Sequence, residues 1–251
     1  MEWYEKLYTK EYINLCGFAI PEQTKIEANF VADVLELNSQ SALLDLCCGF
    51  GRHTFEIAKR INCRIVGLDL SDDYLDLARK KYSSPFIQYV KGDMRDIKLN
   101  LQFDAVMNLF TSFGFFPSDE ENEKVIKEVN KVLKEKGLFL LDYENKFHFV
   151  FNDVLKKGHH WEKLGKNKYC IIKNEYDMVK EREIFSAKII KKGKDEVNIS
   201  YNIRLYSLPE LQNMLERNGF EIINCWGDFD KTDYSVKSRR LITLSRKIKN
   251  I

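Results

Sequence analysis

The feature that most constrains the fold is an alternation of short apolar runs with helix-like segments along the first half of the chain. Segments with helical spacing alternate with strand-like runs, which cover residues 42–47, 64–69, 86–91, 103–109 and 138–143. Strands separated by helices in this way predict βαβ units and a parallel sheet. Two more strands are expected near the end of the chain, at residues 220–225 and 241–245.

The pattern changes between residues 145 and 206, where no helical period is visible. Strand-like runs at residues 169–176, 183–190 and 197–206 are separated by polar or glycine-bearing turns, which predicts a small antiparallel sheet. The predicted fold is therefore α/β, with a Rossmann-like, seven-stranded, mostly parallel sheet, helices on both faces, and an antiparallel β insertion after the fifth strand. We expect a core domain of residues 1–145 and 207–251, and an inserted subdomain of residues 146–206 that acts as a lid over an acceptor site or as a dimer contact.

Composition limits the classes of partner. The chain has 40 basic and 38 acidic residues, and a net charge of +2 provides no global field for a nucleic acid. No apolar stretch reaches the roughly 20 residues of a membrane helix, and no signal peptide is recognisable. The six cysteines form no C-x-x-C pair, so free thiols and no metal site are expected. These features predict a cytoplasmic protein, a monomer or a homodimer, with no nucleic-acid or membrane partner.

A glycine-bearing turn, Asp45-Leu46-Cys47-Cys48-Gly49-Phe50-Gly51, follows the first strand. Glycine permits unusual backbone dihedral angles and the close approach of a ligand. The turn would lie at the carboxyl edge of the parallel sheet, where open α/β folds bind ligands. Such turns also occur for packing alone, so this motif by itself is a weak signal.

Acidic residues at the ends of the next strands strengthen the prediction that this turn binds a ligand. Asp69 ends the second strand, 24 residues beyond Asp45, and Asp93 directly follows the third. A carboxylate at the first of these positions can accept the ribose hydroxyls of an adenosine. Each acid could equally cap a helix or lie in a solvated loop, but their placement at successive strand ends favours a nucleotide-type ligand.

The glycine spacing indicates which nucleotide is bound. A dinucleotide site requires G-x-G-x-x-G. Here Thr54 occupies the position of the third glycine, and Cys47 lies two residues before the first of the two glycines that are present. A diphosphate needs the amides of a full glycine loop, whereas a zwitterionic methionine tail does not. The pattern therefore favours S-adenosylmethionine over NAD.

Four segments carry a family resemblance: residues 43–53, 67–71, 92–95 and 108–114. Together they resemble the class I S-adenosylmethionine-dependent methyltransferase superfamily, and are similar to its bacterial small-molecule branch, which includes amino-sugar N-methyltransferases. The resemblance implies that the cofactor-binding residues are Asp45, Cys47, Gly49, Gly51, Asp69, Leu70, Asp93, Met94 and Leu109. It places the methionine portion on the glycine turn, the ribose on Asp69 and the adenine against Leu70 and the pair 93–94. One departure is Phe115, where amino-sugar enzymes often carry histidine.

The expected reaction is in-line displacement at the sulfonium methyl carbon, in which the protein aligns the acceptor and excludes water. An amine acceptor must be neutral when it attacks, and a hydroxyl acceptor needs a base. The predicted acceptor-site residues are Tyr8, Tyr12, Arg52, Ser112, Phe113 and Tyr143, with Tyr4, His159, His160 and Trp161 in the same hypothesis. The alternatives are helix packing for the early tyrosines, a solvated loop for the histidines and surface exposure for Arg52.

The favoured function is methyl transfer to a nitrogen or oxygen atom of a small molecule. No Asn/Asp-Pro-Pro-aromatic motif follows the fourth strand and no Pro-Cys dipeptide is present, so exocyclic-amine and cytosine-C5 methyltransferases are disfavoured. The alternatives are a methyltransferase acting on RNA or protein, an NAD-dependent oxidoreductase, and a cofactor-binding scaffold without activity.

Overall fold

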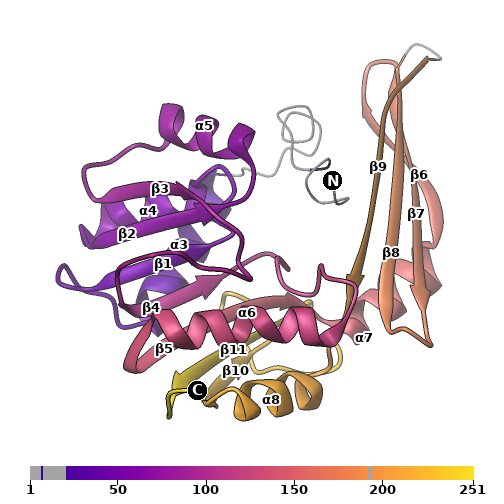
Figure 1. Ribbon diagram of the computed structural model, residues 1–251. Coiled ribbons are helices and arrows are strands. Elements are labelled where there is room, and N and C mark those ends of the chain that lie inside the picture. The colour runs from indigo at the N-terminus through magenta and orange to yellow at the C-terminus, as the bar shows by residue number, and fades with distance from the viewer. Residues whose placement is uncertain (1–6, 8–20, 192–193) are drawn as a thin grey trace.

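The main sheet has seven strands. The computed structural model describes residue 7, residues 21–191 and residues 194–251, and the strand order is β10-β11-β5-β4-β1-β2-β3 (Figure 1). The strands are β1 (Ala42–Leu46), β2 (Arg64–Asp69), β3 (Ile87–Lys91), β4 (Phe103–Asn108), β5 (Leu133–Glu144), β10 (Phe220–Trp226) and β11 (Arg240–Lys247). Strands β1 to β5 pair in parallel, while β11 is antiparallel to both β5 and β10. The predicted Rossmann-like, mostly parallel sheet is confirmed.

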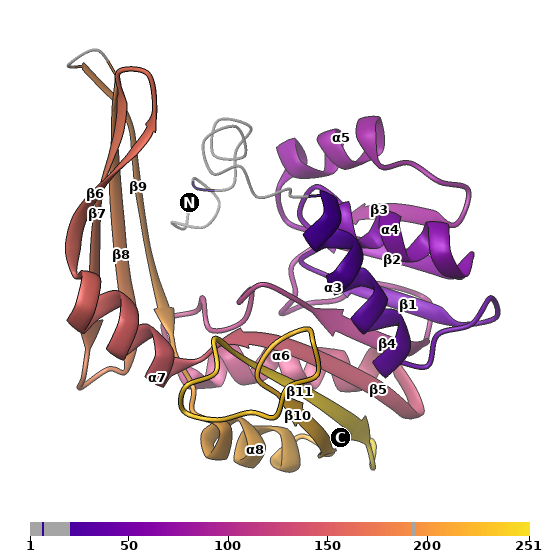
Figure 2. The same cartoon turned by 180° about the vertical axis from the view of Figure 1, so that it is seen from behind.

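Helices cover both faces of this sheet because successive strand residues point to opposite sides. Leu43 packs in a cluster with Phe30 and Ile57, from α3 (Pro21–Val34) and α4 (Arg52–Ile61). Leu44 packs in a second cluster with Val125 and Leu211, from α6 (Asp119–Val132) and α8 (Leu208–Arg217). The helices α6 and α8 lie in front of the sheet in Figure 1, and α3 lies in front of it in Figure 2. A further helix, α5 (Asp72–Lys81), packs beside β2 and β3.

Serine side chains fix where three helices begin. Ser71 accepts a hydrogen bond from the Tyr74 amide, and Ser118 accepts one from the Glu121 amide. Ser207 and Glu210 form a reciprocal capping box at the start of α8. The helix α6 ends at Val132. The chain leaves the helix there because Leu133 is fully buried and pairs with Phe103 of β4.

A second sheet follows β5, with four antiparallel strands in the order β6-β7-β8-β9. They are β6 (His159–Gly165), β7 (Lys168–Asp177), β8 (Arg182–Lys191) and β9 (Lys194–Arg204). The antiparallel insertion is thus confirmed, although only three strands were expected. Strand β6 was missed because it is polar and mostly exposed, and so lacks apolar alternation. The division of the chain into a core domain and an inserted subdomain stays a prediction.

Two helical segments precede this sheet, where none was predicted. They are α7 (Lys146–His148) and the π-helix η1 (Phe149–Lys157). Hydrogen bonds in a π-helix join residues five apart, so its residues do not follow the 3.6-residue period by which helices are recognised in a sequence. The prediction of a segment without helices was wrong for that reason.

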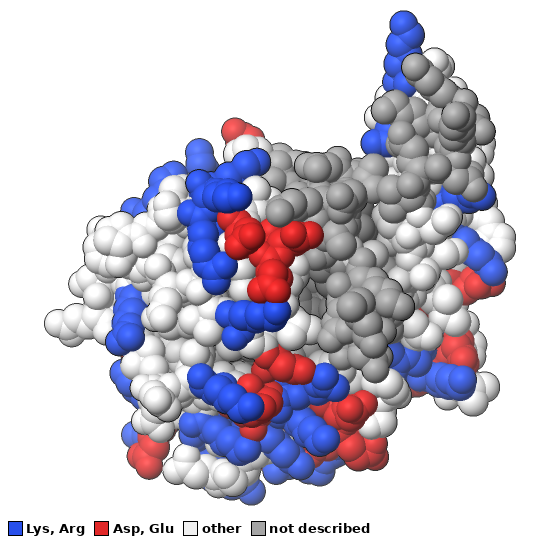
Figure 3. Space-filling model, turned by 45° about the horizontal axis from the view of Figure 1, so that its top comes forward, with Lys and Arg blue, Asp and Glu red and all other residues white. Residues whose placement is uncertain are grey.

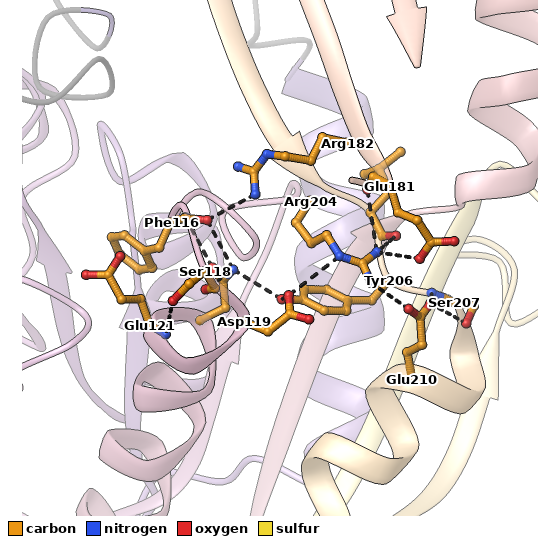
Figure 4. A network of polar contacts seen from close by, with 12 residues as sticks. Phe116, Ser118, Asp119, Glu121, Glu181, Arg182, Arg204, Tyr206, Ser207 and Glu210 are labelled. Atoms are coloured by element: carbon orange, nitrogen blue, oxygen red, sulfur yellow. Dashed lines mark hydrogen bonds and ion pairs between the residues drawn. The ribbon is translucent and has the colours of Figure 1, made fainter. Parts of the chain in front are cut away.

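Polar contacts attach the second sheet to the main domain (Figure 4). The guanidinium of Arg204, at the end of β9, donates to Glu210 of α8 over 2.6 Å and lies over the Tyr206 ring at 4.5 Å. Arg182, at the start of β8, donates to the Phe116 carbonyl over 3.1 Å. The inner ends of β8 and β9 are therefore held against the loops that begin α6 and α8.

Candidate active site

A cavity of about 740 Å³ lies at the carboxyl ends of the central parallel strands. Its wall includes the turn after β1, the ends of β2 and β3, the loop after β4 and the end of β5. The second sheet completes it with Glu183, Tyr201 and Ile203. Both sheets therefore contribute to one cavity, at the edge where the sequence predicted a ligand site.

The turn after β1 folds back on itself with three residues, Cys47, Gly49 and Gly51, in the left-handed region. Cys47 has a φ of 62° and Gly49 a φ of 56°, and both line the cavity. The Gly49 amide donates to Asp69 over 2.8 Å, which ties the turn to the end of β2. Gly51 is not on the cavity wall, contrary to prediction. At a φ of 82°, a Cβ on this residue would overlap the Tyr89 hydroxyl, so Gly51 is required for packing beneath the turn.

Asp45 is the last residue but one of β1 and lies on the cavity wall, where it is 3% exposed. Its carboxylate accepts a hydrogen bond from the Thr54 hydroxyl over 2.5 Å. Burial raises the pKa of Asp45 to about 7, although that hydrogen bond opposes the rise. Thr54 occupies the position of the third glycine of a dinucleotide site, and the structure gives it this different task.

The next two strand ends bring carboxylates and apolar side chains to the same wall. Asp69 accepts the Gly49 amide with one oxygen and the Ser71 amide with the other, over 2.8 and 2.9 Å. A carboxylate has about four lone-pair sites, so it can still accept ligand hydroxyls. Asp93 is paired with Arg95 over 2.7 Å, and its pKa is lowered by the hydrogen bonds from Arg95, which outweigh desolvation.

Leu70, Met94 and Leu109 also line the cavity, as predicted positions for contacts with a cofactor. Apolar side chains beside carboxylates at successive strand ends are what an adenosine requires, because its ring faces are apolar and its ribose hydroxyls donate hydrogen bonds. The residues present therefore fit the predicted cofactor.

The loop after β4 belongs to the 108–114 segment of the family resemblance, and its backbone is strained. Phe110 and Thr111 have φ values of 58° and 56°, which non-glycine residues rarely adopt. The Phe110 amide donates to the Asp142 carboxylate over 2.8 Å, and the Thr111 amide donates to the Asp142 carbonyl over 3.1 Å. Asp142 of β5 also accepts from the Arg240 guanidinium of β11. One buried aspartate thus holds the strained loop and the arginine together.

The Phe110 ring is surrounded by cationic and aromatic groups. The guanidinium carbons of Arg52 and Arg240 lie 4.4 and 5.0 Å from its centroid, and the His53 ring stacks on it at 5.2 Å. Glu27 of α3 accepts from both Arg52 and His53 over 2.7 Å. Burial lowers the pKa of His53 to about 4 despite that carboxylate. Arg52 therefore lines the cavity with a buried rather than surface-exposed side chain, and its place in the acceptor site stays a prediction.

The other acceptor-site predictions have mixed outcomes. Ser112 lies on the cavity wall, where its hydroxyl donates to the Leu109 carbonyl over 2.9 Å. Phe113 and Tyr143 do not reach the cavity, because both are at most 1% exposed and pack on each other at 6.1 Å. The Tyr143 hydroxyl donates to the Arg204 carbonyl instead. The structure therefore corrects these two predictions.

The remaining candidates lie elsewhere. Tyr4, Tyr8 and Tyr12 lie outside the described residues. His159, His160 and Trp161 are on β6, not in a loop, and are not on the cavity wall.

Sequence reasoning missed the acidic corner of the cavity. Glu144 and Glu183 line it, together with Tyr201. The signal for Glu183 was present as a charged residue in an otherwise apolar alternation along β8.

One group in the described part of the chain brings three potential metal ligands together. Oxygens of Glu144 and Asp153 lie 3.8 and 4.0 Å from the Nδ1 atom of His148, and all three atoms are within 4.8 Å of one another. The expectation of no metal site was drawn from the cysteines and stays a prediction. The charges of Glu144 and Asp153 also act on Glu183.

Comparisons with known proteins place this geometry in context. Residues 43–137, from β1 to the start of β5, match a family model described as a methyltransferase domain. A putative methyltransferase of Bacillus subtilis, YqeM, is 27% identical over 226 residues, covering 86% of this chain and 87% of that protein. The chain is also similar to a Streptomyces venezuelae protein named dTDP-3-amino-3,4,6-trideoxy-alpha-D-glucopyranose N,N-dimethyltransferase, at 32% identity over 46% of this chain and 48% of that protein.

The fold has close counterparts among solved structures. An S-adenosylmethionine-dependent methyltransferase from Clostridium acetobutylicum superposes with a TM-score of 0.79, covering 99% of this chain and all of that chain. The identity is 18%, so this likeness concerns the fold. It extends over the second sheet as well as the main one.

Proposed function

We propose that this chain, a class I S-adenosylmethionine-dependent methyltransferase, transfers the methyl group to a nitrogen or oxygen atom of a small-molecule acceptor. The observation that carries the proposal is the cavity built from both sheets. Its volume of about 740 Å³ is in the range of small-molecule sites, and its wall runs from the glycine turn to the second sheet. A cofactor on the glycine turn leaves the second-sheet end for the acceptor.

S-adenosylmethionine supplies the reactive methyl group, which is bound to a positively charged sulfur. The protein therefore needs to bind the two reactants, to orient them and to exclude water. In this proposal Asp45, Cys47 and Gly49 hold the methionine portion. Asp69 accepts the ribose hydroxyls, and Asp93 faces the adenine amino group. The apolar side chains of residues 70, 94 and 109 pack on the adenosine.

The acceptor end is assigned to the inserted segment. Tyr201 and Ile203 of β9 form a wall that polar and apolar parts of a small molecule can contact. We propose that residues 146–206 close the acceptor site, which is the lid role predicted for this subdomain. Positioning the two reactants in such a site supplies much of the rate enhancement of a methyl transfer.

The surface and one relative support a small acceptor. Basic and acidic side chains are interspersed over the face seen in Figure 3, as the net charge of +2 suggests. A polyanion such as RNA is bound mainly through an excess of positive charge. The Streptomyces venezuelae relative is named as acting on an amino sugar. None of the described helices has the length and apolarity to cross a membrane.

The test is a screen of amine, hydroxyl and carboxyl acceptors with radiolabelled S-adenosylmethionine, in which S-adenosylhomocysteine release is measured. We expect turnover with a small molecule and none with Asp69→Ala, which serves as the cofactor-binding control. Label transferred only to RNA or protein of a cell extract would contradict a small acceptor.

A further inference from the structure

On one face of the second sheet, strand β8 presents a single carboxylate among apolar residues. Along β8 this face presents Glu183, Phe185, Ala187 and Ile189, and β9 adds Tyr201 beside them. Glu183 is 5% exposed and lies on the cavity wall. Burying a carboxylate among apolar residues is costly unless a cation is paired with it. In the described part of the chain no lysine or arginine forms an ion pair with Glu183.

The groups around Glu183 add negative charge. Glu144, at the end of β5, lies on the same cavity wall, and Asp153 of η1 is close enough to act on Glu183 electrostatically. The cations nearby are already engaged. Lys157 pairs with Asp153 over 2.8 Å, and Arg240, which lies opposite Glu144 in the main sheet, is paired with Asp142. Among the described residues, each of these cations is therefore paired with another carboxylate and none with Glu183.

We propose that the acceptor is a protonated amine and that Glu183 is the base that removes its proton. This inference rests on the proposed function and names the acceptor class for the same site. An ammonium group supplies the missing charge, and it is attracted strongly because the corner is shielded from water. Glu144 binds beside it, and the Tyr201 hydroxyl, which donates to Glu183, fixes the orientation of the carboxylate.

The transfer balances as follows. One ammonium N–H bond breaks, its proton goes to a Glu183 carboxylate oxygen, and its electron pair remains on nitrogen. That lone pair forms the new nitrogen–carbon bond to the methyl group, and the electron pair of the broken carbon–sulfur bond stays on sulfur. The nitrogen takes over the positive charge that the sulfur loses, so no further reactant is required.

The acid–base properties of Glu183 suit this role. Burial, reinforced by the charge of Glu144, raises its pKa to about 8. A base is most effective when its pKa lies near the working pH. The arriving ammonium favours the ionised carboxylate, so the base becomes active when its substrate is bound.

The test compares Glu183→Gln and Glu183→Asp with Glu162→Gln, a matched control on the same sheet whose side chain is 57% exposed. With an amine acceptor at pH 7, we expect Glu183→Gln to lower kcat by about 100-fold or more, as for loss of a general base. Its activity should rise at high pH, where the free amine is already neutral. Glu183→Asp should recover part of the rate, and Glu162→Gln should behave as wild type.

Two readouts do not depend on turnover. Calorimetric affinity for S-adenosylmethionine should stay within twofold in every variant, because Glu183 is assigned to the acceptor. Chemical denaturation should show wild type losing stability relative to Glu183→Gln as pH rises from about 4.5 to 8. Stability falls in this direction because the folded protein retains the proton of Glu183 over that pH range, while the unfolded chain releases it.

The outcomes separate this inference from the proposed function. Amine turnover by Glu183→Gln within threefold of wild type, with an unchanged pH profile, would overturn the base assignment. Turnover with hydroxyl acceptors alone, or activity abolished by EDTA and restored by Mg²⁺ or Mn²⁺, would overturn the amine class but leave a methyltransferase. Tyr201→Phe, which keeps the ring, gives a second test if Glu183→Gln does not fold. Its kcat should fall at neutral pH, and wild-type turnover would count against the inference.

Discussion

At the residue scale, two glycines of one turn are required for different reasons. Gly49 lies on the cavity wall, whereas Gly51 lies against the Tyr89 ring. The ring carbon that bears the hydroxyl would be 2.8 Å from a Cβ at Gly51. A sequence motif places both residues in a ligand-binding turn, but only the packing of β3 beneath the turn reveals that the second glycine serves the fold.

Gly51→Ala should therefore destabilise the protein. We expect a loss of about 3 kcal/mol, from the left-handed backbone and the overlap together. Urea denaturation measures it, and Gly165→Ala is the control because a Cβ there meets nothing within 4 Å. Adding Tyr89→Phe should recover part of the loss. Equal stability of the two alanine variants would show that the turn can rearrange.

Asp69→Ala tests the ribose assignment. Loss of hydrogen bonds to a carboxylate should weaken cofactor binding by about 1.5–3 kcal/mol. Titration calorimetry with S-adenosylmethionine measures the change, and Asp76→Ala on the exposed side of α5 is the control. Because Asp69 also holds the Gly49 amide, a thermal melt must show that the variant is folded. Unchanged affinity in a folded variant would remove Asp69 from the ribose site.

The carboxylates at 69 and 93 could be predicted because they follow strands whose ends must meet at one sheet edge. The acidic corner could not, because Glu144 and Glu183 are 39 positions apart in the sequence and meet only through the packing of two sheets. Phe113 and Tyr143 were assigned to the acceptor site because they are aromatic and follow strands. Burial against each other, which no local pattern reports, removes them from it.

At the element scale, the loop after β4 is kept in a strained conformation by Asp142. This residue joins three elements, since it accepts from the Phe110 amide and from Arg240 of β11 while belonging to β5 itself. Asp142 is completely buried, and its pKa is raised by burial even though Arg240 opposes the rise. The position of Phe110 in the cavity therefore depends on an ion pair between two strands.

Arg240→Gln should cost about 3–5 kcal/mol, because it leaves the Asp142 carboxylate buried without a cation. Adding Asp142→Asn removes that charge, so the double variant should be more stable than the sum of the single changes predicts. Guanidinium denaturation of all four proteins provides the cycle. Arg79→Gln, from an exposed pair with Asp76, should change stability by less than about 1 kcal/mol. Additive losses in the cycle would mean that the two residues do not act as a pair.

Elements with an apolar run or a clear period were predictable, and elements with neither were not. The short apolar runs of β1, β2 and β4 gave the positions of these strands within a few residues. The π-helix η1 and the polar strand β6 were missed because neither shows the period by which a helix or a strand is recognised. Their positions depend on the second sheet as a whole.

At the scale of the whole molecule, cofactor binding should be visible as stability. A ligand at 100 times its Kd stabilises the folded state by about 2.7 kcal/mol. For a chain of this length that corresponds to a rise in Tm of about 5–11 °C. Differential scanning fluorimetry should show it with S-adenosylmethionine and not with NAD at the same concentration. A rise with NAD alone would contradict the cofactor assignment.

The Cys47 side chain has a consequence for the lifetime of the enzyme. Its sulfur lies on the cavity wall, 3.4 Å from the sulfur of Met94. Desolvation, with the charges of Asp69, Asp45 and Asp93, holds the pKa of this thiol well above its usual range. The nucleophilic form of cysteine is the thiolate, and a thiol kept protonated reacts slowly with alkylating agents. We therefore expect burial of Cys47, reinforced by the carboxylates that fit the nucleotide, to slow alkylation of this thiol by the methyl donor.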